Sequence, residues 1–370
     1  MKIRSLELKN FRNYDEVQIE FSEGVNIFYG DNAQGKTNIL EAVFLGATSR
    51  SHRAGKDREM IRFGEEEAHI KYYVEKRGIT DRIDMHLKKN RAKGIALNGV
   101  PLRRASDLFG NANVVFFSPE DLNIIKEGPS QRRRFMDTEL CQLDRVYMNH
   151  LSHYNKVILQ RNKLLKELEF HRDYMDTLQV WDMQLVRYGC EVIKRRREFI
   201  GQLESIIRKI HSNITGGREE IRLVYEPNVS EQEFEKELEV KRPRDMKARA
   251  TLSGPHRDDL AFLSGDMDIR IFGSQGQQRT AALSLKLAEI EIVRERLGDC
   301  PVLLLDDVLS ELDGSRQEKL LDSIESVQTL LTCTGVDGFV RDRFPVNQIF
   351  RVSQGSVVKE NSVSGRKKIL

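Results

Sequence analysis

Residues 30–37, GDNAQGKT, restrict the possible folds of this chain more than any other segment, because they fit the pattern GxxxxGK[ST]. The apolar run VNIFY at residues 25–29 predicts a buried strand before them, and residues 37–46 have the spacing of an amphipathic helix. Such a loop lets successive backbone N–H groups point at phosphate oxygens, and the helix N-terminus adds partial positive charge. The segment predicts a nucleotide phosphate site in an α/β lobe. A chance match in a glycine-containing turn is the alternative, which the flanking elements disfavour.

Two side chains of this loop have distinct expected roles. The Lys36 ammonium can neutralise the β and γ oxygens of a nucleotide, and the Thr37 hydroxyl can ligate Mg²⁺. The predicted nucleotide-binding residues of the loop and the following helix are Gly30, Asp31, Asn32, Ala33, Gln34, Gly35, Lys36, Thr37 and Asn38.

Two acidic residues end the apolar run PVLLLDD at residues 301–307, which predicts a core strand. A phosphate loop requires a metal-holding acid at the end of a neighbouring strand, so Asp306 is the expected Mg²⁺ ligand together with Thr37. Asp307 is placed to orient or deprotonate an attacking water, and it is the predicted catalytic residue. The alternative interpretation is a strand that ends in solvated acids. The presence of a phosphate loop favours the interpretation of these acids as metal-binding and catalytic residues.

A second glycine-containing turn lies just before this strand. Lys36 and Asp306 are 270 positions apart, and between them residues 272–279, FGSQGQQR, precede a long amphipathic helix predicted for residues 277–297. Ser and Gly at a helix N-terminus again form a phosphate-binding element. In a two-fold dimer, each such element can close on the γ-phosphate bound to its partner. An ordinary capped helix is the alternative.

The rest of the chain predicts two lobes, as its length of 370 residues also suggests. Strand patterns dominate residues 61–100 and 250–272, and residues 131–214 have helical spacing, whereas EQEFEKELEV followed by Pro243 predicts a loop-rich return. We therefore expect an α/β ATPase lobe built from both chain ends, residues 1–122 and 296–370. A mainly helical lobe, residues 123–295, is inserted between them and carries the second glycine-containing turn.

The charge balance limits where nucleic acid can bind. Lys and Arg total 60 against 57 acidic residues, so a nucleic-acid surface must come from local clustering. Residues 85–104 hold six basic residues and no acid, and we predict a sequence-independent DNA contact at Lys88, Lys89, Arg91 and Lys93. Residues 132–134 are the next candidate cluster, whereas we interpret residues 194–197 as a solvated face.

Other features favour a cytoplasmic protein. The four cysteines are far apart and form no CxxC pair, which argues against a disulfide framework or a zinc site among them. The N-terminus lacks the apolar run of a signal peptide, and no segment approaches the roughly 18 apolar residues of a membrane span. We expect a soluble, cytoplasmic chain without a membrane contact.

The ordered set of motifs resembles the ABC-type ATPase heads of the SMC family, and in detail the RecF family. The resemblance runs nearly from end to end. It rests on LELKNFRNY, GDNAQGKTN, TSRSHR at 48–53, SPEDLNIIKEGPSQRRRFMD at 118–137, LSGPHRDD at 252–259, GSQGQQR at 273–279 and LLLDDVLSELD at 303–313. The inserted lobe is far too short for the long coiled coil of SMC proteins, which matches RecF.

The resemblance implies a function in DNA repair, replication and recombination. RecF-like ATPases bind DNA and ATP, dimerise when ATP is held between phosphate loop and signature, and work with RecO and RecR. They help to load RecA at single-strand gaps bordered by duplex. By resemblance, Arg12 and Asn13 lie near the nucleotide phosphates, and Ser274, Gly276 and Gln277 form the signature that faces the partner subunit's ATP. Residues 310–313 form the dimer-facing loop.

The expected ATPase activity is weak and acts as a switch. Asp307 stands where a Glu is usual, Gln275 replaces the first signature glycine, and residues 332–334 contain no histidine. Two other readings remain open at the level of the sequence. One is a metabolic kinase or transport ATPase that does not act on DNA, and the other is an adaptor in which nucleotide only rigidifies a protein-binding surface.

Overall fold

The computed structural model describes residues 1–167, 175–324, 326–335 and 346–360. The chain divides into two compact units, of which the first combines residues 1–119 with 293–370 and the second comprises residues 120–292. Helix α8 (Gln275–Leu297) continues from the second unit into the first. Each unit has its own hydrophobic core.

A mainly parallel sheet of six strands positions the phosphate loop in the first unit. Its strand order is β15-β14-β3-β13-β12-β8, and β15 pairs antiparallel with β14 at one edge. The strands are β3 (Val25–Tyr29), β8 (Val114–Phe117), β12 (Val302–Asp306), β13 (Thr329–Cys333), β14 (Val346–Ser353) and β15 (Ser356–Glu360). Because β3, β13 and β12 run parallel, their carboxyl ends meet at one edge. That edge carries both predicted nucleotide-site segments.

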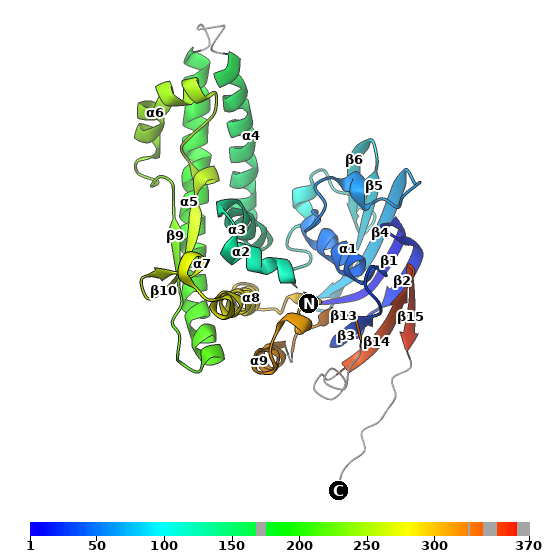
Figure 1. The fold of residues 1–370 in the computed structure, drawn as a ribbon. Coiled ribbons are helices and arrows are strands. Elements are labelled where there is room, and N and C mark those ends of the chain that lie inside the picture. Colours follow the sequence, from blue (N-terminus) through cyan, green and yellow to red (C-terminus); the bar gives the residue numbers. More distant parts are fainter. Residues whose placement is uncertain (168–174, 325, 336–345, 361–370) are drawn as a thin grey trace. The chain divides into compact units, whose positions relative to one another are not determined.

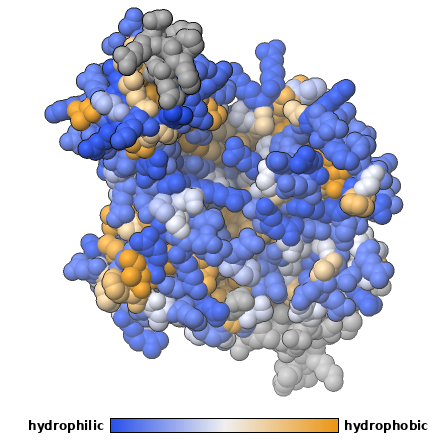
Figure 2. All heavy atoms as spheres, turned by 45° about the horizontal axis from the view of Figure 1, so that its top comes forward, coloured by the Kyte–Doolittle hydropathy of each residue, from blue (hydrophilic) through white to orange (hydrophobic). Residues whose placement is uncertain are grey.

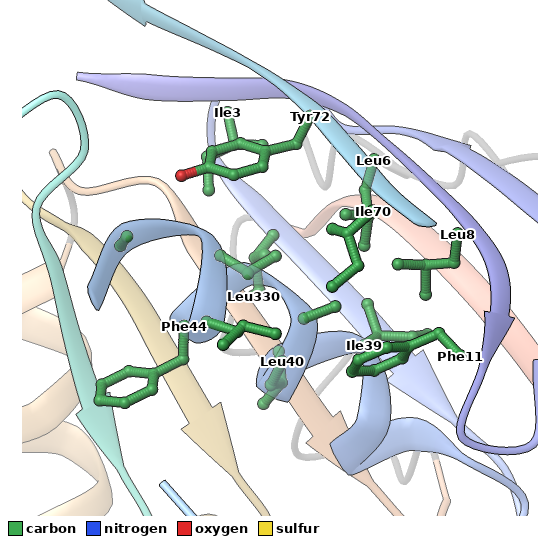
Figure 3. Close-up of a cluster of buried hydrophobic side chains, with 14 of the residues drawn as sticks. Ile3, Leu6, Leu8, Phe11, Ile39, Leu40, Phe44, Ile70, Tyr72 and Leu330 are labelled. Atoms are coloured by element: carbon green, nitrogen blue, oxygen red, sulfur yellow. The ribbon is translucent and has the colours of Figure 1, made fainter. Parts of the chain in front are cut away.

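A second six-stranded sheet of the first unit is antiparallel, with the order β2-β1-β4-β5-β6-β7. Its strands are β1 (Lys2–Phe11), β2 (Tyr14–Glu20), β4 (Glu67–Lys76), β5 (Ile79–Lys88), β6 (Arg91–Leu97) and β7 (Val100–Pro101). Alternating apolar residues of these strands pack on helix α1 (Lys36–Thr48), as Figure 3 shows for Ile70 beside Ile39, whereas Tyr72 lies beside Ile3. The opposite face of the sheet carries polar residues.

The second unit is mainly helical. Helices α4 (Arg145–Glu167) and α5 (Met175–Thr215) lie side by side (Figure 1), and a three-stranded sheet has the order β11-β10-β9. The other elements of this unit are α2 (Leu122–Lys126), α3 (Pro129–Leu143), α6 (Phe234–Ala248), α7 (Ile269–Phe272), β9 (Arg222–Glu226), β10 (Asp259–Ser264) and β11 (Met267–Asp268). The helical spacing predicted for residues 131–214 is confirmed for the described residues, and residues 168–174 of that range lie outside them.

Short helices connect these elements in both units. They are η1 (Asp57–Met60), η2 (Ala105–Leu108), η3 (Pro119–Asp121), η5 (Pro255–Arg257) and η6 (Leu309–Glu311), with α9 (Gly314–Ile324) after η6. None of the helices in the described ranges has the length and apolar character that a membrane crossing needs. Hydrophilic side chains cover most of the face shown in Figure 2, and apolar residues occur on it in separate patches.

Two sequence-based expectations for the second unit were wrong. The predicted loop-rich return is helix α6, because Phe234 and Leu238 share one helix face and are buried. Pro243 lies inside α6, where it removes the hydrogen bond to the carbonyl of Glu239, an exposed residue. Residues 250–272 are not strands throughout, since the Asp268 side chain accepts the Arg270 N–H and starts α7.

Candidate functional site

The phosphate loop joins β3 to α1 and follows a backbone path that needs glycine. Gly30 has a φ of 151°, Gly35 has a φ of 113°, and Ala33 also adopts a positive φ of 64°. A Cβ at Gly30 would lie 2.2 Å from the Val352 carbonyl oxygen, so only glycine lets the loop pass this close to β14. The loop is therefore held in a conformation that few other sequences can adopt.

Lys36 begins helix α1 and folds back over the loop. Its Nζ donates hydrogen bonds to the carbonyl oxygens of Gly30 at 2.6 Å and Asp31 at 2.8 Å, and the residue is buried. The Lys36 ammonium is thus held at the carbonyl groups of the first two loop residues.

Thr37 and Asp306 meet at the shared sheet edge. The Thr37 hydroxyl donates to Asp306 Oδ1 at 2.8 Å, and the Thr332 hydroxyl at the end of β13 donates to the same oxygen at 2.7 Å. A hydroxyl and a carboxylate side by side are the hard oxygen ligands that Mg²⁺ prefers. The donor set therefore fits the expected magnesium ion.

Asp307 follows β12 in a strained backbone conformation, with a φ of 53°. Its N–H donates to the Thr332 hydroxyl oxygen at 3.0 Å, and its carbonyl accepts a hydrogen bond from the Ser310 hydroxyl at 2.8 Å. These contacts link the backbone of the predicted catalytic residue to β13 on one side. On the other side they link it to η6, which begins the predicted dimer-facing loop.

Asn13, in the turn between β1 and β2, ties the loop to helix α1. Its Nδ2 donates to the Gln34 carbonyl at 2.8 Å, and its Oδ1 accepts from Asn38 Nδ2 at 2.8 Å. The neighbouring Arg12 has a φ of 54° and donates two hydrogen bonds, of 2.8 and 2.6 Å, to the carboxylate of Glu41. Asn13 thus contacts the loop, whereas Arg12 contacts Glu41 on α1, and the role of both residues at the nucleotide phosphates stays a prediction.

Glu41 is a functional candidate that the sequence reasoning missed. It lies on α1, its side chain is fully buried, and it accepts hydrogen bonds from Arg12, Ser51 and Arg53. Burial by itself raises the pKa of Glu41, but these three hydrogen bonds outweigh it and hold the pKa at about 2. The only sequence signal was an acid within the apolar run ILEAVFLG.

The turn between β14 and β15 is a second feature that the sequence reasoning missed. The N–H of Gln354 donates to Gln34 Oε1 at 2.6 Å, and the Gly355 N–H donates to the Gln34 carbonyl at 3.4 Å. Gly355 has a φ of 76°, and a Cβ there would lie 2.4 Å from the Asn13 carbonyl oxygen. This C-terminal hairpin therefore covers the phosphate loop. The Gln354-Gly355 pair between two strands is a turn signal that could have indicated it.

A cavity of about 780 Å³ opens beside the loop in the first unit. Its lining includes Arg12, Asn13, Asn38, Arg53, Arg58 and Phe63. The lining also includes Glu59, and Arg12 and Arg53 pair with Glu41, so the space combines the exposed ring of Phe63 with charges of both signs. Such a lining suits a nucleotide base or ribose adjoining the bound phosphates.

The signature residues start helix α8 in the second unit. The Ser274 hydroxyl oxygen accepts the Gln277 N–H at 3.2 Å, and Gln277 Oε1 accepts the Ser274 N–H at 2.9 Å, which makes a capping box. Ser274 and Gly276 are exposed. The helix start is therefore rigid and open to solvent, with its N-terminal partial charge available.

The predicted DNA-contacting lysines have acidic partners from other elements. Lys89 pairs with Glu66 at 2.8 Å, and Lys88 lies 3.9 Å from Glu67. Lys93 is 15% exposed and bridges Asp57 and the Ser49 carbonyl, at 2.9 and 2.7 Å. The positive charge of residues 85–104 is thus compensated by acids from other segments. The order of residues along the chain does not reveal these pairs. Arg91, at the start of β6, is exposed.

The other basic clusters contain structural arginines. Arg132 is 1% exposed and donates to both carboxylate oxygens of Asp259, at 2.6 and 3.0 Å, so it offers no surface for DNA. Arg196 is 2% exposed and pairs with Asp258 at 2.9 Å and Asp137 at 2.7 Å. The interpretation of residues 194–197 as a solvated face is wrong for Arg196, because its side chain is buried against Asp258.

Comparisons with known proteins bear on this site. The model of the RecF/RecN/SMC N-terminal domain matches residues 2–339. The chain is 59% identical to the DNA replication and repair protein RecF of Agathobacter rectalis, over 96% of this chain and 99% of that protein. It is 58% identical to the protein of the same name from Lachnospira eligens, over 98% and 100%.

Solved structures are also similar. A RecF–ATP structure of the recombination mediator in the RecFOR pathway has a TM-score of 0.91 and 36% identity, and the match covers 97% of each chain. An SMC head bound to a domain of ScpA has a TM-score of 0.58 and 18% identity, which reflects the shared fold alone. The expected ABC-type ATPase fold is confirmed. Because these matches span nearly the whole chain, it belongs to the RecF family of DNA replication and repair proteins, within the RecF/RecN/SMC group.

Proposed function

We propose that this protein is an ATP-dependent, DNA-binding recombination mediator in DNA repair and replication. It dimerises around ATP and helps to load RecA at single-strand gaps, together with RecO and RecR. The observation that carries the nucleotide part is the hydrogen bond of Thr37 to Asp306, which joins the phosphate-loop helix to the end of β12. The similar RecF–ATP structure supports the same assignment, and the relatives' function in DNA replication and repair disfavours a metabolic or transport ATPase.

The loop residues bind the phosphates in this proposal. Backbone N–H groups of residues 30–38 face the anion, and Lys36 exchanges its bonds to the Gly30 and Asp31 carbonyls for phosphate oxygens. Thr37 and Asp306 would hold Mg²⁺, which when bound neutralises charge on the β and γ phosphates. The base and ribose occupy the cavity beside Asn13 and Phe63.

Asp307 orients or deprotonates the attacking water. Its backbone is held by Thr332 and Ser310, which fixes the start of its side chain just after β12. Aspartate is one methylene shorter than the glutamate that is usual in ABC-type ATPase heads, so its reach toward the water is shorter. Hydrolysis is therefore slow, and the ATP-bound dimer persists until it occurs. ATP thus acts as a switch between the dimer and the monomer.

The two units have different roles in the dimer. The first unit is the ATPase lobe, and the second carries the signature Ser274, Gly276 and Gln277 at the exposed start of α8. A helix N-terminus with two N–H groups and a hydroxyl nearby can receive the γ-phosphate bound to the partner subunit. Residues 310–313 adjoin the same interface.

DNA binding rests on Lys88, Lys89, Arg91 and Lys93 as phosphate contacts without base readout. Duplex phosphates must compete with Glu66, Glu67 and Asp57 for the lysines, so the contribution of each is reduced. Lys93 contributes least because its ammonium is already held by two oxygens.

The decisive experiment compares duplex binding and sedimentation with and without ATP for wild type and Lys36→Met. Loss of the ammonium removes charge neutralisation at the phosphates, so ATP binding, ATP-dependent dimerisation and any ATP-dependent gain in DNA affinity are expected to fall together. Lys156→Met, at an exposed position of α4, is the matched control and should behave as wild type. Normal ATP binding by Lys36→Met would refute the phosphate site. If wild type bound DNA equally well with and without ATP, the result would favour the alternative of an adaptor in which nucleotide only rigidifies a protein-binding surface.

A further inference from the structure

Three potential metal ligands lie together on the polar face of the antiparallel sheet. Glu67 and His69 are two residues apart on β4, and His86 on β5 is the direct cross-strand partner of His69. Ala68 and Ile70, which alternate with them, point into the core. Strand alternation therefore places the carboxylate and both imidazoles on the same solvent-facing surface.

Their donor atoms already converge. His86 Nε2 lies 2.8 Å from Glu67 Oε2, and His69 Nε2 lies 3.7 Å from Glu67 Oε1. The two imidazole rings are stacked, with centroids 4.0 Å apart, and one ligand atom from each residue lies within 4.8 Å of the others. Bonds of about 2.0–2.2 Å at a tetrahedral ion separate neighbouring ligand atoms by about 3.4 Å. The observed separations lie on both sides of that value, so small side-chain rotations suffice.

The chemistry of the three groups selects the type of ion. Two imidazoles and one carboxylate suit Zn²⁺ and other first-row transition ions, whereas Mg²⁺ prefers oxygen ligands throughout. All three side chains are substantially exposed, so an ion can enter and water can complete its coordination. We propose that Glu67, His69 and His86 form a surface site for a divalent transition metal, Zn²⁺ being the best fit.

Lys88 is the natural competitor for this site. Its Nζ lies 3.9 Å from Glu67 Oε2, the oxygen that also contacts His86. A cation at the site would have to replace this ammonium as the partner of the carboxylate. Removing the Lys88 charge should therefore strengthen metal binding, whereas a change that only loosened the sheet would weaken it.

The test measures Zn²⁺ binding to the untagged full-length protein by competition with a chromophoric chelator, with Mg²⁺ present in excess. Wild type is expected to bind one Zn²⁺ more than His69→Gln/His86→Gln. Glu67→Gln should lower the affinity of that ion at least about tenfold, because losing a ligand costs no less than losing an outer-sphere contact. Lys88→Met should raise it.

Glu66→Gln is the matched control, because Glu66 is the adjacent carboxylate and pairs with Lys89 instead. It should leave Zn²⁺ binding unchanged. Co²⁺ added to wild type should give visible absorption bands that Glu67→Gln and the double histidine variant lack. Equal Zn²⁺ stoichiometry and affinity in wild type and Glu67→Gln would overturn the proposal, as would equal effects of Glu66→Gln and Glu67→Gln.

Discussion

At the scale of single residues, the buried Glu41 makes the site depend on pH. Its pKa of about 2 in the folded protein is below the ordinary value of 4.5, so the unfolded chain binds the proton more readily. The stabilisation is fully present above pH 4.5 and is lost as the pH falls toward 2. The difference corresponds to about 3 kcal/mol at neutral pH.

Glu41→Gln is therefore expected to lower the free energy of unfolding by about 3 kcal/mol at pH 7 and by less at pH 3. Urea unfolding at both pH values measures this, with the exposed Glu20→Gln as the control that should change little at either. A destabilisation of the same size at pH 7 and pH 3 would show that the carboxylate charge is not the cause.

Also at the scale of single residues, a substitution of Asp307 distinguishes ATP binding from ATP hydrolysis. Asp307→Asn keeps the shape and the backbone contacts to Thr332 and Ser310 but removes the base. ATP binding should persist, hydrolysis should fall by about 100-fold or more, as is typical of a lost general base, and the ATP-bound dimer should live longer. Single-turnover hydrolysis and nucleotide titration decide this. If Asp307→Asn hydrolysed ATP as fast as wild type, another residue would have to orient the attacking water.

At the scale of elements, the β14–β15 hairpin supports the phosphate loop from a distant part of the chain. Gly355→Ala would place a methyl group 2.4 Å from the Asn13 carbonyl at a positive φ, so the turn must move away from Gln34. We expect ATP affinity to fall by about tenfold, the equivalent of one lost hydrogen bond.

Gly265→Ala is the matched control, because Gly265 also has a positive φ of 59° in a hairpin turn but meets nothing within 4 Å. Both variants should lose about 1 kcal/mol of stability from backbone strain. Only Gly355→Ala should weaken binding of a fluorescent ATP analogue. Equal ATP affinity in the two variants would show that the hairpin does not contribute to ATP binding.

At the scale of the whole molecule, the signature is expected to matter only when two subunits meet. Ser274→Arg puts a bulky cation at the exposed start of α8. ATP binding to the monomer should survive, whereas ATP-dependent dimerisation and hydrolysis should be lost. Sedimentation with ATP measures this, and Asp266→Arg, on the exposed turn between β10 and β11, is the control. A wild-type dimer fraction for Ser274→Arg would contradict the sandwiched arrangement.

The sequence alone was sufficient for the phosphate loop, the acids after β12, the helical middle of the chain and the family resemblance. These features depend on short contiguous segments, whose periodicity and turn residues report local structure directly. The fold class was predictable for the same reason. The resemblance added the signature and the residues Arg12 and Asn13.

Only the tertiary structure decided which distant groups meet. Glu41 gains its arginines from segments on both sides of it, and Gln34 meets Gln354, 320 positions away. Lys88 and Lys89 pair with acids at and just before the start of β4, and Arg132 is buried against Asp259. Strand register and helix packing set these pairs, and no local pattern encodes them. A cluster of basic residues in the sequence therefore indicates a DNA-binding surface only when the acids near it in space are known.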